Sequence, residues 1–455
     1  MTGYRKGNLM TSNTSPFTIT RALRGNFFDI GGIIKTPAEI EANARYLEDG
    51  MMFLDGGKIV WLGSREEGEK TLMELSYPVP LDDYRDKLLV PGFIDTHIHY
   101  PQTEMIGAYG EQLLEWLNNY TFPTEAQYHD IDYANKMSKF FVDQLLNNGT
   151  TTALVFGTVH PQSVDALFTV AAALNMRLIA GKVMMDQNAP DSVLETPEES
   201  ERDTRTLIDR WHNHKRLSYA LTPRFVPTSS PELLAKVRQI RQEHPDIYLQ
   251  THLCENVDEI SWVKSLYPEH QGYLDVYHDY GLTGSRCVFA HCIHLHDAEW
   301  DCLHDTDSSI AFCPTSNLFL GSGLFDINTS WQKQVRLGMG TDVGAGTSFS
   351  MLQTLGEAYK VGQLQKYRLS AFEAFYHATL GGARALHLDD KIGNFEAGKE
   401  ADIVVLDPSA TALQQLRTGN CKTLAEKLFV LMTLGDDRNI FRTLVDGKVV
   451  YQRPD

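Results

Sequence analysis

The chain has 455 residues, enough for one large domain and a smaller one, and its 42% hydrophobic and 22% charged residues are ordinary for a globular protein. The formal net charge of -18 argues against nucleic acid or an anionic membrane surface as a partner, because both are bound through patches rich in Lys and Arg. The composition therefore favours a small neutral or weakly charged substrate.

The ends and the cysteines of the chain bear on its location. The first residues, MTGYRKGNLMTSNTSPFTITRALRGN, lack the apolar core of a signal peptide, and no apolar run reaches the length of a membrane span. The six cysteines follow no regular spacing, which predicts reduced thiols rather than a disulfide framework. We therefore expect a cytoplasmic protein whose polar start is disordered or a tag-like extension.

Both ends of the chain predict short β-strands. Phe17–Phe28 and Arg45–Gly63 have strand composition, and the second contains the Asp-Gly and Gly-Gly turns typical of a hairpin. Ala401–Leu406 and Arg442–Tyr451 repeat this pattern, again with an Asp-Gly turn. We expect the two ends to pair into one small β-sandwich domain, with two unrelated β appendages as the alternative.

Between these ends, apolar β-branched runs alternate with helical patterns, which predicts a parallel sheet. After a first strand that ends near His97, further strands are expected at Thr151–Phe156, Arg177–Met184, Leu217–Leu221, Ile247–His252, Arg286–His291, Ser309–Cys313 and Val335–Gly340. Helices are expected at Tyr133–Leu146, Ser163–Leu174, Pro231–Glu243 and Ser350–Gln365, and the acidic stretch Asp186–Thr206 reads as a solvated loop leading into a helix.

Eight strand and helix pairs over this length predict an α/β fold, a (β/α)8 TIM-like barrel. We place the barrel at residues 91–392, with residues 1–90 and 393–455 as the two parts of the small β domain. A doubly wound open sheet is the alternative, but the sequence has nothing like the Gly-rich dinucleotide turn of that fold.

The most informative stretch is LLVPGFIDTHIHYPQ, from Leu88 to Gln102. In a strand, His97 and His99 lie two residues apart and share one face, so both imidazoles point the same way. Neutral imidazole is the commonest protein ligand for a first-row metal. On its own, the pair is compatible with two ligands of a metal site or with two histidines at a strand end that bind no metal.

Three later strands decide between these readings. His252 ends the fifth expected strand with Glu255 three residues on, His291 ends the sixth, and Asp342 follows the eighth. Because the carboxyl ends of all barrel strands meet at one mouth, these side chains are expected to converge there with the H-x-H pair. The sequence therefore predicts a metal site.

The pattern of H-x-H followed by His, His and Asp, with the phrases VPGFIDTHIH and GKEADIVVLD, resembles the amidohydrolase superfamily of metal-dependent hydrolases. Within it, HIHYPQ, TPRFVPTSS, QTHLCEN, FAHCIHL, CPTSNLFLGSGLF and GTDVGAGTSFSML resemble the guanine-deaminating family, over nearly the whole chain. The resemblance implies hydrolysis of guanine to xanthine and ammonia by a homodimer. Another aromatic amine hydrolase (acting on triazines, cytosine or adenosine derivatives) and a non-catalytic metal-bearing scaffold are the alternatives.

The resemblance also implies the metal. Binuclear members bridge two ions with a Lys from the fourth strand, but here that strand ends in ALTPRF, with Arg224 and no Lys. One Zn²⁺ per chain is therefore expected, although the ligand types also fit iron. Its ligands would be His97, His99, His252 and Asp342.

Roles for the other residues follow from the same resemblance. Glu255 would carry protons to the purine ring and the leaving ammonia, Asp342 would take the proton of the attacking water, and His291 would hydrogen-bond that water or the developing oxyanion. The alternative for Glu255 is a surface carboxylate at a helix start. Recognition of guanine falls to Gln102, Arg224 and Phe225, the last of which fits a core residue equally well.

Further residues near the site have weaker signals. Trp116 and Phe122 would line or cover the pocket, and Asn317, Leu318 and Phe319 would face the substrate. Cys254, Cys292 and Cys313 are expected beside the predicted site, as buried thiols rather than ligands.

Overall fold

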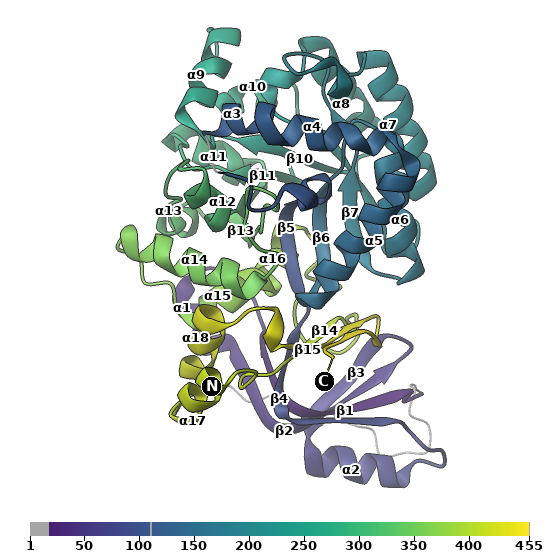
Figure 1. The fold of residues 1–455 in the computed structure, drawn as a ribbon. Coiled ribbons are helices and arrows are strands. Elements are labelled where there is room, and N and C mark those ends of the chain that lie inside the picture. The colour runs from purple at the N-terminus through teal and green to yellow at the C-terminus, as the bar shows by residue number, and fades with distance from the viewer. Residues whose placement is uncertain (1–17, 110–111, 455) are drawn as a thin grey trace.

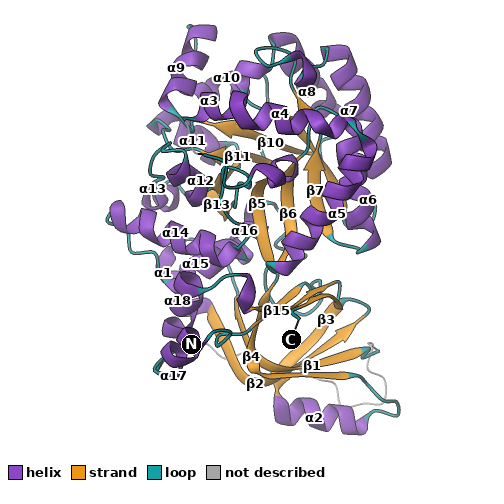
Figure 2. Ribbon diagram, viewed as in Figure 1, coloured by secondary structure: helices purple, strands orange, loops and turns teal. Residues whose placement is uncertain are grey.

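A computed structural model describes residues 18–109 and 112–454, so the polar start at residues 1–17 lies outside the described residues. The upper part of the molecule is a near-closed barrel of parallel strands surrounded by helices, and a separate sheet lies below it (Figures 1 and 2). The predicted (β/α)8 barrel is confirmed. In sheet order its strands are β13 (Arg336–Met339), β12 (Ser309–Phe312), β11 (Cys287–His291), β10 (Tyr248–Leu253), β9 (Leu217–Pro223), β7 (Arg177–Gly181), β6 (Thr150–Phe156) and β5 (Phe93–His99), with β8 (Val183–Met184) paired to β9.

The first and last barrel strands are tied together at their carboxyl ends. The Asp342 amide donates to the His97 carbonyl at 2.9 Å, and the His99 amide donates to the Val343 carbonyl at 2.9 Å. These bonds hold the H-x-H stretch of β5 directly beside the loop that follows β13. Two distant parts of the sequence thus reach the same edge of the barrel.

One predicted strand is two strands in the structure. The stretch from Leu88 onward divides at Gly92, where β4 (Leu81–Pro91) leaves the lower sheet and β5 enters the barrel. A Cβ atom at Gly92 would lie 2.0 Å from Oγ1 of Thr151, so only glycine allows the chain to pass there.

The four predicted helices are present within a residue or two at each end, as α5 (Ile131–Asn147), α6 (Pro161–Ala173), α8 (Pro231–Glu243) and α14 (Met351–Leu364). The expected solvated loop at Asp186–Thr206 is shorter, because α7 begins at Pro197 behind a capping box made by Thr196 and Glu199. The other helices are α1 (Pro37–Asn43), α2 (Arg65–Glu74), α3 (Leu113–Trp116), α4 (Phe122–Ala126), α7 (Pro197–Trp211), α9 (Val257–Leu266), α10 (Tyr273–Asp279), α11 (Asp297–Asp305), α12 (Pro314–Phe319), α13 (Ile327–Gln332), α15 (Ala371–Ala378), α16 (Leu380–Ala385), α17 (Ala412–Gly419) and α18 (Leu424–Leu434). None of the described helices is long and apolar enough to cross a membrane.

The lower sheet is built from both ends of the chain, as predicted. Its strands, in order, are β16 (Lys448–Gln452), β15 (Ile440–Val445), β14 (Ile403–Leu406), β4, β1 (Arg21–Ile30), β2 (Ala44–Asp55) and β3 (Lys58–Ser64). A sandwich would have two sheets, but these strands form a single hydrogen-bonded sheet. The sheet curls, so that Ile403 and Leu444 share an apolar core with Leu23 and Ile59. The domain limits at residues 90 and 392 stay predictions.

A buried ion network joins the barrel to this sheet. Glu400, at the start of the C-terminal part, accepts hydrogen bonds from Arg177 of the barrel at 2.6 and 2.9 Å and lies 2.7 Å from Arg216. Arg216 also pairs with Asp402. Burial alone would raise the pKa of Glu400, but the Arg177 hydrogen bond and the charges of Arg216, Arg177 and Lys58 lower it to about 2.

We therefore expect Glu400→Gln to destabilise the protein at pH 7, by about 3–5 kcal/mol, the usual cost of breaking a buried pair. A carboxyl group with a lowered pKa stabilises the fold above its ordinary pKa of 4.5, and this contribution is lost as the pH falls toward about 2. In urea unfolding, the variant and the parent should thus differ less in free energy of unfolding at pH 3 than at pH 7. The half-exposed Glu396, changed to Gln, is the control, with little expected effect at either pH. An equal loss of stability for Glu400→Gln at pH 7 and at pH 3 would contradict the argument.

Candidate metal centre and active site

The four predicted metal ligands meet at the mouth of the barrel. His97 and His99 come from the end of β5, His252 from β10 and Asp342 from the loop after β13. The Nε2 atom of His99 lies 3.2 Å from Nε2 of His97 and 3.2 Å from Nε2 of His252. Oδ1 of Asp342 lies 3.1 Å from Nε2 of His97 and 3.4 Å from Nε2 of His99.

These separations fit four ligands of one ion, which can expand to a fifth position for water. Ligand atoms about 2.0–2.1 Å from a tetrahedral zinc ion lie about 3.3 Å from one another. The Nδ1–H group of His252 donates to the Arg224 carbonyl at 2.7 Å, which leaves the Nε2 lone pair facing the cluster. Burial lowers the pKa of His97, His99 and His252, which keeps the rings neutral. Three imidazoles and one carboxylate with these orientations are able to hold a first-row metal ion.

Two aspartates with opposite pKa shifts border this cluster. Burial raises the pKa of Asp95 to about 7, although its carboxylate accepts hydrogen bonds from the amides of Thr341 and His97 at 3.1 and 3.2 Å. Burial alone would also raise the pKa of Asp342, but the facing rings of His97, which also hydrogen-bonds it, of His291 and of His99 lower this pKa far below its usual range. Asp95 therefore ties the backbones of β5 and the β13 loop together, while Asp342 remains an anion.

Glu255 and His291 form a second pair beside the cluster. Oε2 of Glu255 lies 3.5 Å from Nε2 of His291, and Oε1 accepts a hydrogen bond from Ser322 at 3.1 Å. Burial raises the pKa of Glu255, which makes its carboxyl group easier to protonate than that of an exposed glutamate. Burial alone would lower the pKa of His291, but the charges of Glu255 and Asp342 raise it. Glu255 is buried, so its alternative reading as a surface carboxylate is wrong.

Backbone geometry at the strand ends turns several of these side chains inward. Cys254, His291 and Asp342 have φ angles of 50°, 70° and 52°, in the left-handed region that residues other than glycine seldom adopt. Each lies where a barrel strand gives way to its loop. Strained backbone of this kind is common at functional sites.

A pocket opens onto the cluster. It is lined by His99, Gln102, Leu113, Trp116, Leu117, Arg224, Phe225, His252, Glu255, Glu259, His291, Leu320, Asp342 and Ala345. The segment after β5 supplies its cover, since Trp116 and Leu117 share an apolar cluster with Phe225 and Leu320. The expectation that Trp116 lines the pocket agrees with this geometry.

Arg224 and Gln102, the residues predicted to bind substrate, are held by a third residue that the sequence analysis did not identify. Nη1 of Arg224 donates to Glu125 at 2.8 and 3.0 Å, and Nε2 of Gln102 donates to the same carboxylate at 3.1 Å. The Arg224 guanidinium also lies 5.4 Å from the centre of the Phe122 ring. Glu125 thus holds the Arg224 guanidinium and the Gln102 amide at the pocket wall, and the Phe122 ring packs against the Arg224 guanidinium.

Several further expectations are modified by the structure. Phe225 lines the pocket and also packs, in an edge-to-face contact, against Trp262. It therefore has features of both a substrate-facing residue and a core residue. The expectation that Asn317, Leu318 and Phe319 face the substrate is not met, because none of them lines the pocket. Oδ1 of Asn317 instead accepts a hydrogen bond from Nδ1 of His291 at 2.8 Å. The short helix α12 turns this side chain toward β11, and the pocket wall at this point is Leu320.

Glu259 is a second residue missing from the predicted site. Its Oε2 accepts the amides of Glu255 and Asn256 at 3.0 and 3.2 Å, and its Oε1 accepts from the Tyr273 hydroxyl at 3.0 Å. Burial raises the pKa of Glu259 to about 7. The spacing Asn256 to Glu259 is a capping-box pattern, so this signal was present in the sequence.

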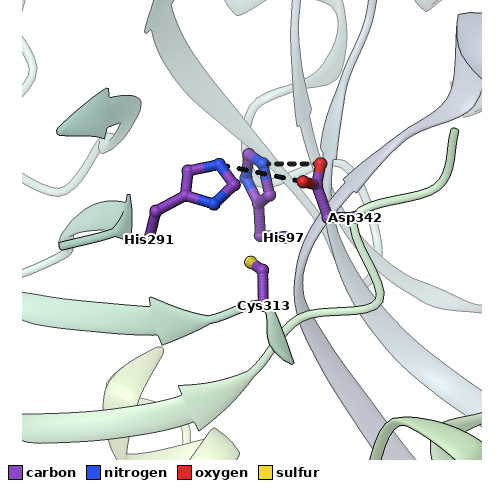
Figure 3. Close-up of side chains that lie close together, drawn as sticks. All are labelled: His97, His291, Cys313 and Asp342. Atoms are coloured by element: carbon purple, nitrogen blue, oxygen red, sulfur yellow. Dashed lines mark ion pairs between the residues drawn. The ribbon is translucent and has the colours of Figure 1, made fainter. Parts of the chain in front are cut away.

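Cys313 lies beside the cluster. Figure 3 shows its thiol below His97, with His291 and Asp342 on either side. One ligand atom from each of these four residues can be chosen so that all lie within 4.8 Å of one another. The thiols of Cys254 and Cys292 belong to no such group among the described residues.

Comparison with known proteins agrees with the geometry. Residues 88–450 match the model of the Amidohydrolase family. The chain is 64% identical to guanine deaminase of Escherichia coli (strain K12) over 433 residues, which is 95% of this chain and 98% of that one. The solved E. coli guanine deaminase superposes with a TM-score of 0.94 over 95% of this chain and all of the other. Guanine deaminase from C. acetobutylicum, solved with guanine in its active site, is 31% identical with a TM-score of 0.86 over 95% of this chain and 100% of that one.

Proposed function

Because the chain belongs to the amidohydrolase family, we propose that its pocket hydrolyses guanine to xanthine and ammonia. The observation that carries the proposal is that one pocket joins three imidazoles and a carboxylate to Glu255 and Arg224. The chain is a hydrolase, and its relatives at 64% and 31% identity are guanine deaminases. Solved triazine hydrolases are 22–23% identical and support only the shared fold.

We assign one zinc ion to His97, His99, His252 and Asp342, on the strength of their separations and neutral rings. When bound, zinc acts as a Lewis acid and lowers the pKa of water to about 7, which makes a nucleophile available at neutral pH. Asp342 is an anion that accepts the proton of the attacking water. His291 lies 3.7 Å from Oδ2 of Asp342 and hydrogen-bonds the oxygen that adds to the purine carbon.

Glu255 moves the protons that deamination requires. Hydrolysis replaces the amino group of the purine by oxygen, so the ring nitrogen beside the reacting carbon and then the departing amine must each gain a proton. Ser322 holds Oε1 of Glu255, and Oε2 is directed toward His291 and the reacting atoms. The raised pKa of this buried carboxyl group suits transfer in both directions.

Recognition of guanine uses the donors and acceptors at the pocket wall. Nη1 of Arg224 is engaged by Glu125, and the remaining guanidinium donors are available to the guanine carbonyl. Gln102 accepts the Gly344 amide and donates to Glu125, so its second N–H group is available for the purine edge. Phe225 and Leu117 enclose the flat faces of the ring.

The direct test is turnover by the purified protein. Guanine absorbance should fall with equimolar release of ammonia, and metal analysis should find about one ion per chain. Activity on a triazine, cytosine or an adenosine derivative, with guanine inert, would assign the chain to another amine hydrolase. A metal-loaded protein inert on all of them would favour a binding scaffold.

Arg224→Ala should raise KM for guanine and leave the metal content unchanged. It should also destabilise the fold by about 3–5 kcal/mol, because the Glu125 carboxylate would be left buried without its partner. Steady-state kinetics and denaturant unfolding separate the two effects. The double variant Arg224→Ala with Glu125→Ala should recover stability but not KM, and loss of the ion would instead indicate a structural role.

We further propose a cytoplasmic location and a homodimer. All six cysteines are free thiols, which suits the cytoplasmic location inferred from the sequence. The homodimer rests on family resemblance alone, and sedimentation of the purified chain tests it.

A further inference from the structure

The two oxygens of Asp342 face different sets of side chains. Oδ1 lies 3.1 Å from His97 and 3.4 Å from His99, within the ligand set assigned to the zinc ion. Oδ2 lies 3.7 Å from Nε2 of His291 (Figure 3). The carboxylate is therefore placed to bridge from one ligand set to a second one.

The second set contains donors of another chemical type. The thiol of Cys313, the His291 ring and Asp342 belong to a buried group whose ligand atoms lie within 4.8 Å of one another (Figure 3). His97 belongs to this group too, but its Nε2 atom already serves the first ion. Nδ1 of His291 is paired with Asn317, which leaves Nε2 of His291 to face the cluster.

We propose that His291, Cys313 and Oδ2 of Asp342 form a second, weaker cation site, selective for a soft divalent ion such as Cd²⁺ or excess Zn²⁺. The proposal rests on occupation of the first site by an ion, because the two sites share Asp342. A thiolate ligand selects soft cations over Mg²⁺ or Ca²⁺. Glu255, 3.5 Å from Nε2 of His291, can add a carboxylate oxygen.

The site is weak for two structural reasons. Binding replaces the proton of the Cys313 thiol by the cation, and the proton leaves to solvent. The bound cation would also lie beside another divalent ion, separated by a single carboxylate. The Cys313 thiol also lies buried in an apolar cluster with Ile94 and Leu154, and it makes a long contact of 3.5 Å to the Ala311 carbonyl.

Occupation of this site should inhibit the enzyme. The cation would engage His291 and displace Glu255 from the reacting atoms, in the space that the purine must enter. Micromolar soft metal should therefore inhibit, while Mg²⁺ and Ca²⁺ at the same concentration should not.

The experiment adds Cd²⁺ to the single-ion protein and follows bound metal, ultraviolet absorbance and turnover together. We expect a second equivalent of metal after desalting, a cadmium–thiolate charge-transfer band, and loss of activity. Cys313→Ser should keep basal turnover, lose the band of the second equivalent, and require about tenfold or more Cd²⁺ for half-inhibition. Cys287→Ser, a buried cysteine at the other end of β11, should behave like the parent.

Several outcomes would overturn the proposal. Uptake of no second equivalent, or an unchanged band and inhibition in Cys313→Ser, excludes Cys313 as a ligand. The half-buried Cys302 and Cys421 are present in parent and variants alike, so their bands cancel in difference spectra. If Cys313→Ser does not fold, the test is protection by xanthine. Saturating xanthine should block uptake of the second cadmium equivalent by the parent, and uptake that xanthine does not change would contradict the proposed site. Failure of guanine turnover before cadmium is added counts against the proposed function instead.

Discussion

Glu255→Gln should lower kcat about 10²–10⁴-fold while the metal content stays at about one ion per chain. Glutamine keeps the size of the side chain and its hydrogen bond with Ser322, but it cannot carry a proton to the purine ring or the leaving amine. Since we assign recognition of guanine to Arg224 and Gln102, KM should change little. Steady-state kinetics with metal analysis of the same sample measure both quantities.

A neighbouring carboxylate provides the control. Glu259→Gln retains an oxygen for the amides of Glu255 and Asn256 and a polar group for Tyr273, so the loop should stay in place. We expect its turnover within about tenfold of the parent, below a typical general acid–base contribution. If Glu255→Gln also stayed within tenfold, Glu255 would not be the proton carrier.

The barrel and the convergence of the candidate metal ligands could be predicted because they depend on periodicity and on one topological rule. Parallel barrel strands all end at the same mouth, so His97, His252 and Asp342 converge although they are far apart in the sequence. The break at Gly92 was also present in the sequence as a Pro-Gly pair, but an apolar run on both sides hid it.

The supporting residues depend on tertiary packing instead. Glu125 lies on a short helix after an irregular turn, and nothing in its local sequence indicates that it meets Arg224, 99 positions away. The left-handed backbone at His291 and Asp342 is likewise imposed by neighbouring strands and loops. For this reason the sequence indicated candidates for the chemistry but not the residues that hold them in place.

His252→Ala should remove the ion and lower turnover by about 10⁴-fold or more, because Lewis-acid catalysis contributes several kcal/mol and each 1.36 kcal/mol is tenfold in rate. The structure adds a second expected effect. Without an ion, the Nε2 atoms of His99 and His252 and Oδ1 of Asp342 meet at 3.2–3.4 Å in a buried space. A bound ion removes the repulsion between these buried lone pairs. Because a ligand that binds only the native state stabilises that state, the ion should also stabilise the folded protein.

Chelation should therefore lower the melting temperature of the parent, and re-addition of Zn²⁺ should restore it, whereas His252→Ala should respond to neither. His296→Ala, at an exposed histidine beyond β11, is the matched control and should keep the ion, the chelator response and full turnover. Retention of one ion and substantial activity by His252→Ala would mean that the remaining imidazoles and Asp342 suffice, and the four-ligand centre would be wrong. A melting temperature of the parent that does not respond to chelation would show that the cluster is stable without an ion, and the energetic part of the argument would fail even if turnover were lost.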